Sequence, residues 1–199
     1  ALGASPKAIK AYERDKNQIF KYPESDSLSL REAISQKFNI DASKIICGSG
    51  SDQIFDLICK LFLNSEDEVI ITEFGFIMHR IYASLHGGKV IQAKEKNFKA
   101  SVNEIISKVT EKTKIVFIAN PNNPTGTYLS KSEMINLRER LRSDILLVVD
   151  DAYFEFIKED DFASGLELFK NKENVLVTRT FSKIYGLAGL SLGWGYSSK

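Results

Sequence analysis

One lysine and one aspartate follow short apolar runs in the second half of the chain. Lys183 comes after the run at residues 175–178 and has apolar and small neighbours. Such surroundings lower the pKa of an amine and favour a nucleophile or Schiff-base partner, whereas a surface lysine would have more polar neighbours. Asp150 ends the run at residues 145–149, where a desolvated carboxylate needs a protein cation or a cationic ligand group such as a protonated ring nitrogen. A solvated turn suits Asp151 better than Asp150.

Two further loops carry groups that could bind a ligand. Residues 120–126 read Asn-Pro-Asn-Asn-Pro-Thr-Gly, a rigid loop suited to a cis X-Pro bond. It would present the amides of Asn122 and Asn123 to a ligand oxygen, the alternative being a stiff surface loop. Residues 48–52 (Gly-Ser-Gly-Ser-Asp) lead straight into a helical pattern. There, backbone N–H groups could bind a phosphate, although a glycine turn with a serine cap is an equal alternative.

Alternating apolar runs and helical patterns place these loops. The expected strands are residues 44–47, 69–72, 89–91, 115–119, 145–149 and 175–178, with a Gly-rich strand at 193–196. Unbroken apolar runs are typical of strands buried on both faces of a mostly parallel sheet between helices. Ser130 and Glu133 form a plausible capping box for one crossover helix. Because ligands of open α/β sheets bind outside the carboxyl ends of the strands, we expect the four loops to meet at one edge.

Composition describes one globular domain without a disordered tail. The 199 residues include 27 Lys and Arg, 26 Asp and Glu, and 43% hydrophobic residues. A net charge of +1 with scattered basic residues argues against a nucleic-acid partner. No apolar run approaches the roughly 20 residues of a membrane span and no signal peptide is evident, so we predict a cytoplasmic protein. Cys47 and Cys59 are expected to be reduced core residues with no metal site, and His79 and His86 to lie on helix surfaces.

Taken together, the loop sequences resemble the fold type I pyridoxal-phosphate aminotransferases, and most closely the histidinol-phosphate aminotransferase family. The most specific segments are residues 121–126, 149–153 and 181–190, and residues 22–24 and 74–78 also match. This resemblance implies a three-layer α/β/α sandwich around a mostly parallel mixed sheet. It also implies that residues 1–199 are the large, cofactor-binding domain. We expect the family's N-terminal segment and its small C-terminal domain to lie outside this sequence.

The resemblance implies roles for the residues around the cofactor ring. Lys183 would form the Schiff base with pyridoxal phosphate and move a proton between the substrate α-carbon and cofactor C4′. Asp150 would pair with the pyridinium nitrogen and keep it protonated. Asn122 and Tyr153 would hydrogen-bond the phenolic oxygen, and Phe76 would stack on the ring.

A second group of residues is implied at the cofactor phosphate. The backbone around Ser51 and Asp52, with the Ser182 hydroxyl, would hold the phosphate. Tyr22 would reach the phosphate of the neighbouring subunit in a homodimer with sites at the interface. Ser191 stands where the family has an arginine. Loss of that charge-assisted bond should cost about one to two factors of ten in cofactor affinity.

The implied activity is transamination of histidinol phosphate with 2-oxoglutarate, giving imidazole acetol phosphate and glutamate in histidine biosynthesis. A related enzyme, such as a threonine-phosphate decarboxylase or another class II aminotransferase, would share every motif quoted. A non-catalytic sensor or partner module is the third alternative, supported by Ser191 and the missing domains. The intact set of Lys183, Asp150, Asn122 and Tyr153 argues against that module.

Overall fold

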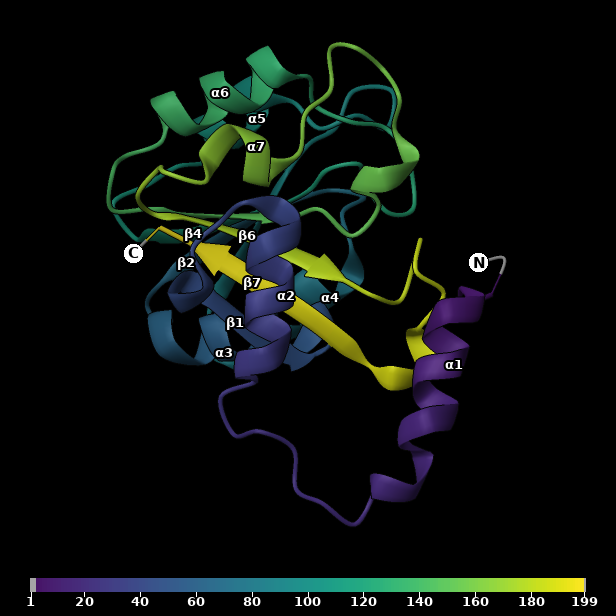
Figure 1. Ribbon diagram of the computed structural model, residues 1–199. Helices are drawn as coiled ribbons and strands as arrows, with labels where there is room; N and C mark the ends of the chain where they lie inside the picture. The colour runs from purple at the N-terminus through teal and green to yellow at the C-terminus, as the bar shows by residue number, and fades with distance from the viewer. Residues whose placement is uncertain (1–2, 199) are drawn as a thin grey trace.

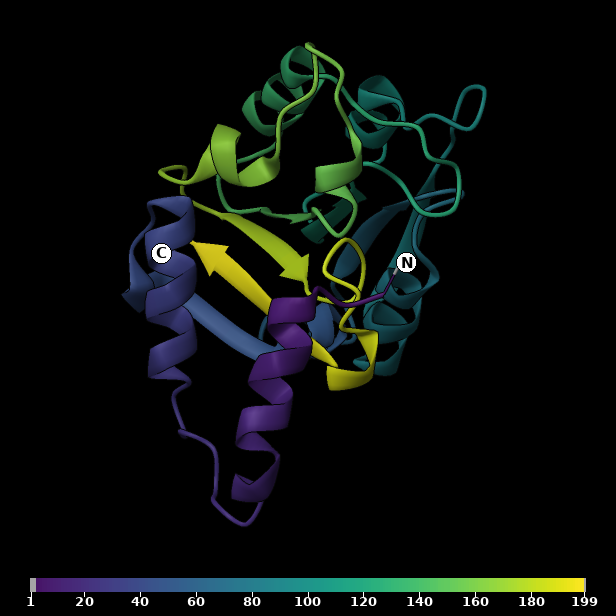
Figure 2. The same cartoon turned by 45° about the vertical axis from the view of Figure 1, so that its right-hand side comes forward.

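Seven strands form one mixed sheet at the centre of the computed structural model, which describes residues 3–198 (Figures 1 and 2). They lie in the order β1-β7-β6-β5-β4-β2-β3. Their bounds are Ile45–Ser49 (β1), Glu68–Thr72 (β2), Lys89–Ala93 (β3), Thr113–Ala119 (β4), Leu146–Asp150 (β5), Val175–Thr180 (β6) and Leu192–Ser197 (β7). Strand β7 is antiparallel to β1 and β6, and the other pairs are parallel. The predicted strands and the mostly parallel mixed sheet are therefore confirmed.

Helices connect the strands and cover both faces of the sheet. The α-helices are Pro6–Asp15 (α1), Leu28–Phe38 (α2), Gly50–Phe62 (α3), Ile77–Leu85 (α4), Val102–Ser107 (α5), Lys131–Arg140 (α6) and Gly165–Phe169 (α7). Short 3-10 turns are Lys16–Gln18 (η1), Ala42–Lys44 (η2), Phe154–Phe156 (η3) and Ala188–Leu190 (η4). The predicted capping box begins α6: the Glu133 N–H donates to Ser130 Oγ, and the Ser130 N–H donates to Glu133 Oε2.

The core has two halves because successive residues of a strand point to opposite faces of the sheet. In β4, Ile115 and Phe117 pack in the cluster formed with α3 and α4. Val116 and Ile118 pack in the other cluster, formed with α5, α6 and α7. Figure 1 shows these two groups of helices on opposite sides of the sheet. The predicted three-layer α/β/α sandwich is confirmed.

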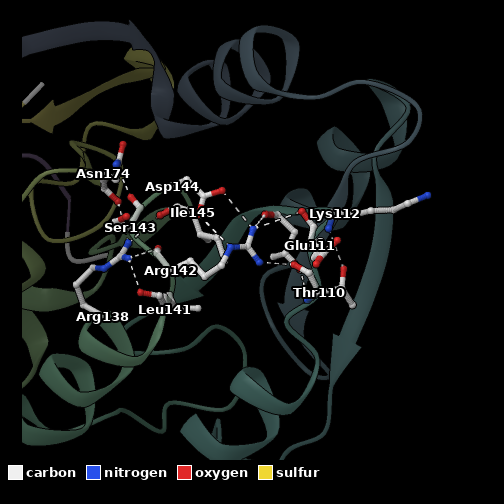
Figure 3. A network of polar contacts seen from close by, with 11 residues as sticks. Thr110, Glu111, Lys112, Arg138, Leu141, Arg142, Ser143, Asp144, Ile145 and Asn174 are labelled. Carbon is white, nitrogen blue, oxygen red and sulfur yellow. Dashed lines mark hydrogen bonds and ion pairs between the residues drawn. The ribbon is translucent and has the colours of Figure 1, made fainter.

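Two arginines occupy the edge of the sheet at which the parallel strands begin (Figure 3). The buried Arg138 guanidinium donates to four backbone carbonyl oxygens, those of Leu141, Arg142, Ile145 and Asn174. The Arg142 guanidinium donates to the backbone carbonyl oxygens of Thr110, Glu111 and Thr113. These bonds reach carbonyl groups at the C-terminal end of α6 and in nearby loops, of which those of Thr110, Arg142 and Asn174 also accept a backbone N–H.

Helix α1 lies to one side of the sheet (Figures 1 and 2). It has no buried residue, and together with the loop at residues 186–190 it lines an apolar groove. Gly186 adopts a positive φ of 66°, and a Cβ at this position would collide with the backbone of Gly3 and Ala4. The absence of a side chain at Gly186 therefore lets the segment before α1 cross this loop.

Cys47 is a partly buried free thiol and Cys59 a buried one, as expected. No helix within residues 3–198 has both the length and the apolar character needed to cross a membrane. Across the same residues, no three His, Cys, Asp or Glu side chains are grouped to hold a metal ion.

Candidate active site

A cavity of about 180 Å³ lies at the carboxyl ends of the parallel strands. It is lined by the loops that follow β1, β4, β5 and β6, and by Phe76 at the start of α4. Most of the predicted site residues meet here: Ser51, Asp52, Phe76, Asp150, Tyr153, Ser182 and Lys183. Because β7 runs antiparallel, its first turn reaches the same edge and adds Ser191 to the lining. The expected meeting of the loops at one edge is confirmed.

Lys183 lies on the tight loop that follows β6. Its Nζ is 5.3 Å from the centre of the Tyr153 ring. The Ser182 N–H donates to Thr180 Oγ1 (3.1 Å), and the Gly186 N–H donates to the Lys183 carbonyl oxygen (3.0 Å). These bonds fix the backbone on both sides of the lysine, so its amine is directed into the cavity from a constrained turn.

Asp150 is the buried carboxylate at the floor of the cavity and is 3% exposed. Its Oδ1 accepts hydrogen bonds from Thr178 Oγ1 and from the Ala152 N–H, both at 3.3 Å. Its Oδ2 lies 3.6 Å from Nε2 of His79. Two hydrogen bonds therefore hold the Oδ1 atom, and the Oδ2 atom faces the His79 ring.

The sequence predicted His79 on a helix surface, but this residue is buried, so that prediction is wrong. Its ring lies 4.7 Å from the Phe117 ring at an interplanar angle of 16°, and 4.7 Å from the Phe55 ring in an edge contact. His79 and Ala83 are the buried residues of α4, one turn apart. That spacing marks the face of the helix that packs on the sheet, and it is the signal that would have placed His79 behind Asp150.

His86, expected on the helix surface, lies at the C-terminal end of α4 and is partly buried. Its Nε2 is 2.7 Å from Asp56 Oδ1 on α3. The contact joins two neighbouring helices outside the cavity. His86 is therefore a packing residue in this structure and contributes nothing to the candidate site.

Asp151 also departs from expectation, because it is only 1% exposed and not in a solvated turn. Its N–H donates to the Thr178 carbonyl oxygen (3.0 Å), so the pairing of β5 with β6 continues through Asp151. The side chain points toward Arg179, with Oδ2 3.7 Å from Nη2. Burial raises the pKa of Asp151 to about 7, although the Arg179 charge opposes the shift.

The N-terminus of α3 forms the other end of the cavity. Gly50 has a positive φ of 74°, and the first turn of the helix contains Ser51 and Asp52. A Cβ on Gly193 would collide with Gly50 and Ser51, so the missing side chain allows β7 to pack directly against this turn. Backbone N–H groups in the first turn of a helix have no partner within the helix and attract anions.

The charges that line the cavity are unevenly divided. Within the described chain, Lys183 is the only Lys or Arg in the lining, whereas Asp52 and Asp150 are both there. Burial and the charge of Asp150 raise the pKa of Asp52, while His79 and Lys183 oppose the shift. Ser191 lines the wall with a short neutral side chain and has a left-handed backbone, φ 45°.

Asn122 lies beside the cavity and is not part of its lining. Its Nδ2 donates to the Phe74 carbonyl oxygen (3.0 Å) and to Thr125 Oγ1 (2.8 Å), and its buried Oδ1 has no partner among the described residues. The adjacent Pro121 and Asn123 do line the cavity. The peptide bonds before both prolines of this loop are cis, as the sequence suggests. The Asn122 amide is therefore held by Thr125 of its own loop and by the loop that contains Phe74.

Tyr22 is a predicted site residue that does not line the cavity. It lies between η1 and α2 with its side chain 98% exposed. Sequence reasoning had missed Thr178 and His79, the two side chains that contact Asp150. Thr178 could have been found from the strand pairing, because it lies opposite Asp150 in the register of β5 and β6.

Comparisons with known proteins agree with this geometry. A family model described as aminotransferase class I and II matches residues 2–199. The histidinol-phosphate aminotransferase of Pelagibacter ubique is 59% identical over 199 residues, which are 100% of this chain and 55% of that protein. That of Paramagnetospirillum magneticum is 46% identical over 196 residues, 98% of this chain and 54% of that protein. This chain therefore spans about half the length of these curated relatives.

A solved structure extends the comparison to three dimensions. The crystal structure of histidinol-phosphate aminotransferase from Sinorhizobium meliloti in complex with pyridoxal-5'-phosphate matches with a TM-score of 0.93 and 26% sequence identity. The match covers 98% of this chain and 53% of the other. The arrangement of strands and helices around the cavity is thus shared with that protein.

Proposed function

The chain belongs to the aminotransferase class I and II family, and on that premise we propose that its cavity binds pyridoxal phosphate for amino-group transfer. The observation that carries the proposal is that the Lys183 amine and the buried Asp150 carboxylate line one cavity with a helix N-terminus. We propose histidinol phosphate as the amino donor and 2-oxoglutarate as the acceptor. The names of the two curated relatives support this choice of donor.

The donor set of the cavity fits this cofactor. Lys183 offers an amine for a covalent link to an aldehyde, and Asp150 offers a buried carboxylate for a protonated ring nitrogen. Phe76 supplies an aromatic wall for a planar ring. The space beside Gly50 is open, with no heavy atom within 4 Å of where its Cβ would stand, so a phosphate can approach the N-terminus of α3.

We propose distinct tasks for the residues around the ring. The bound cofactor supplies an electron sink for the charge that remains when a substrate α-carbon loses its proton. Asp150, held by Thr178 and backed by His79, keeps the ring nitrogen protonated through its negative charge. With its Nζ free, Lys183 would accept the α-proton of the substrate and deliver it to the C4′ carbon of the cofactor. The Tyr153 hydroxyl, together with Asn122, orients the phenolic oxygen.

At the phosphate end, the proposed contacts are neutral donors. The N–H groups of Ser51 and Asp52 and the hydroxyls of Ser182 and Ser191 are the groups available in the lining. A phosphate held without a guanidinium loses one charge-assisted hydrogen bond. We therefore propose that cofactor binding here is weaker than in relatives that carry arginine at this position.

A second copy of the chain completes the proposal. Tyr22 is almost fully exposed, and Ile19 and Phe20 nearby are 88% and 78% exposed. Clustered exposed apolar side chains of this kind favour a protein interface. We propose a homodimer in which Tyr22 reaches the phosphate of the partner. The cytoplasmic location stays a prediction from composition, and residues 1–199 are proposed to act as the cofactor-binding domain.

The direct test is covalent trapping of the cofactor. Pyridoxal phosphate is added, the protein is reduced with borohydride, and the modified peptide is mapped by mass. We expect the adduct on Lys183 and none in Lys183→Ala, because no other amine lines the described cavity. Lys60→Ala, at an exposed position of α3, is the matched control and should still react. An adduct of equal yield in Lys183→Ala would contradict the assignment.

Substrate choice needs a second measurement. Borohydride is left out, histidinol phosphate is added to the cofactor-loaded protein, and the loss of the visible absorbance band is followed. We expect bleaching with histidinol phosphate and recovery of the band with 2-oxoglutarate, as two half-reactions. Release of carbon dioxide from an amino-acid substrate would contradict transamination and favour a decarboxylase.

A further inference from the structure

A buried ionic cluster lies behind the candidate active site, on the other face of the same two strands. Successive side chains of a strand point to opposite faces, so Thr178 contacts Asp150 while Arg179 points away from it. Arg179 Nη2 lies 3.7 Å from Asp151 Oδ2, and Nη1 lies 3.7 Å from Glu155 Oε1. One guanidinium therefore faces two carboxylates from the segment that directly follows Asp150.

Aromatic contacts extend the cluster to the turn that carries Tyr153. The Arg179 guanidinium carbon is 4.1 Å from the centre of the Phe154 ring and 4.9 Å from that of Phe38. Guanidinium groups at such distances from an aromatic ring are attracted to its face. Phe154 follows Tyr153 in the chain, so a shift of Arg179 would be transmitted to the backbone of Tyr153.

The cluster also reaches the loop of the candidate catalytic lysine. Glu155, Arg179 and Tyr185 line one small cavity of about 130 Å³. Tyr185 comes two residues after Lys183, and its ring is 5.4 Å from that of Phe181. Burial and the neighbouring Glu155 raise the pKa of Tyr185. Glu155 is thus close to both Arg179 and the lysine loop.

The contacts of Arg179 differ from those of the buried arginine at the other edge of the sheet. Arg138 donates to four backbone carbonyl oxygens and so completes hydrogen bonds that the fold requires. Arg179 is 3% exposed, yet its Nε and Nη1 make no hydrogen bond within the described chain. Burying charges without hydrogen bonds is costly, and such groups add little to stability compared with a well-packed apolar core. A purely structural role therefore explains Arg138 better than Arg179.

We propose that Arg179 is a positioning residue for the reaction, which with Asp151 and Glu155 fixes the segments bearing Asp150, Tyr153 and Lys183. The inference rests on the proposed function, because it concerns how those three groups hold the cofactor. The cluster touches neither cofactor nor substrate. It acts by limiting the movement of the β5 end, the following turn and the lysine loop, which preorganises the groups in the cavity.

The test compares the same substitution at the two buried arginines. Arg179→Lys keeps the charge and removes the planar fork that spans two carboxylates and two rings. We expect it to weaken pyridoxal phosphate binding about tenfold, as outer residues that orient a site often do. Arg138→Lys is the matched control: it should lower the melting temperature and leave cofactor affinity within about twofold. Affinity is measured by titrating the visible band, with the pH titration of the band as a second readout.

Glu155→Gln supplies an independent variant, because this side chain is 20% exposed and its loss should not prevent folding. We expect about threefold weaker cofactor binding, since one of the two ion contacts of Arg179 is lost. If Arg179→Lys fails to fold, Glu155→Gln decides the matter: weaker binding supports the proposal and unchanged affinity overturns it. The proposal is also overturned if both variants bind the cofactor with unchanged affinity while the pH titration of the visible band is shifted in Glu155→Gln. The cluster would then act on the site through its charge alone and not by positioning.

The wild-type protein separates this inference from the proposed function. A wild type that forms no borohydride adduct on Lys183 would contradict the proposed function itself. A wild type that forms the adduct while Arg179→Lys binds the cofactor with equal affinity would overturn only the role of Arg179. The two failures are thus distinguishable in one set of measurements.

Discussion

Buried polar groups at the two edges of the central sheet differ in their hydrogen bonding. Where the parallel strands begin, Arg138 and Arg142 donate to backbone carbonyl oxygens, and these contacts form a continuous network (Figure 3). Where the strands end, polar side chains remain without hydrogen-bond partners. In the described part of the chain, the buried side-chain atoms without partners belong to His79, Glu95, Asn122, Asp151 and Arg179, all at or near the carboxyl ends of the strands.

This difference separates a stabilising region from the region that contains the candidate active site. A buried polar group without a partner costs free energy, whereas a satisfied one is close to neutral or favourable. The hydrogen bonds at the edge where the strands begin therefore stabilise the folded state. The groups without partners at the edge where the strands end lie outside the cavity lining and are kept at a cost in stability. Substitutions at the two edges should consequently affect different measurements.

The largest effect is expected at Asp150. Asp150→Asn removes the negative charge proposed to hold the ring nitrogen protonated, so the half-reaction with an amino donor should slow about 100-fold. Stopped-flow measurement of the visible band checks this. Asp144→Asn, at the opposite edge, is the control and should leave the rate unchanged. A rate for Asp150→Asn within twofold of wild type would break the proposed division between the edges.

Arg138→Ala tests the edge at which the parallel strands begin. It removes a buried guanidinium that donates to four carbonyl oxygens, of which those of Arg142 and Asn174 keep a backbone donor, so the free energy of unfolding should fall by about 3 kcal/mol. Urea unfolding measures the change. Arg140→Ala, on the same helix but with an exposed hydrogen bond to Asn103, should change stability by less than about 0.5 kcal/mol. Equal effects of the two substitutions would show that the network adds nothing to stability.

Ser191→Arg tests the edge at which the parallel strands end, because it adds a cation there. A guanidinium near the first turn of α3 should tighten pyridoxal phosphate binding about tenfold through a charge-assisted contact. Ser197→Arg, at the other end of the same strand β7, is the matched control and should not alter affinity. Equal or weaker binding by Ser191→Arg would mean that the phosphate is held elsewhere in the cavity.

The smallest expected effect is a pH dependence of stability from Asp151. Its pKa is about 3.9 in an unfolded chain and is raised by burial to about 7 in the fold, so the folded state binds the proton more tightly. The free energy of unfolding should therefore fall as pH rises through 7, by about 1 kcal/mol between pH 6 and pH 8. Urea unfolding at both pH values measures this.

The control for that prediction is Asp151→Asn, which cannot lose a proton and should remove the decrease. Asp144 offers the contrast at the other edge: its hydrogen bond from Arg142 lowers its pKa, so its contribution is lost only in acid. If Asp151→Asn keeps the same decrease between pH 6 and pH 8, another group is responsible.

Much of the site followed from local patterns in the sequence. Apolar runs identify buried strands, and parallel strands bring the residues after them to one edge, so the sequence alone places Asp150, Tyr153 and Lys183 together. The motif at residues 181–190 and the loop at residues 120–126 then identified the family. These inferences succeed because they depend on neighbours in the chain and on general rules of sheet topology.

The burial of the residues behind the site could not be predicted from the sequence in the same way. His79 and Asp151 were expected at the surface because each has polar character and no partner motif nearby in the sequence. Their burial depends on which face of α4 meets the sheet and on the arrival of Arg179 from the next strand. Such contacts join segments far apart in the chain. The helical spacing of His79 and Ala83 marks the buried face of α4, but no local pattern names the residues that meet that face.

The sequence by itself determined which strands and helices follow one another along the chain, the family, and which residues are candidates for the site, because strand and helix periodicity and loop motifs are local properties. Only the tertiary structure decided which polar groups are buried without partners, where Ser191 and Tyr22 lie relative to the cavity, and that Arg179 stands behind the site. These depend on the packing of both helix layers against one sheet, which fixes solvent exposure and distance together.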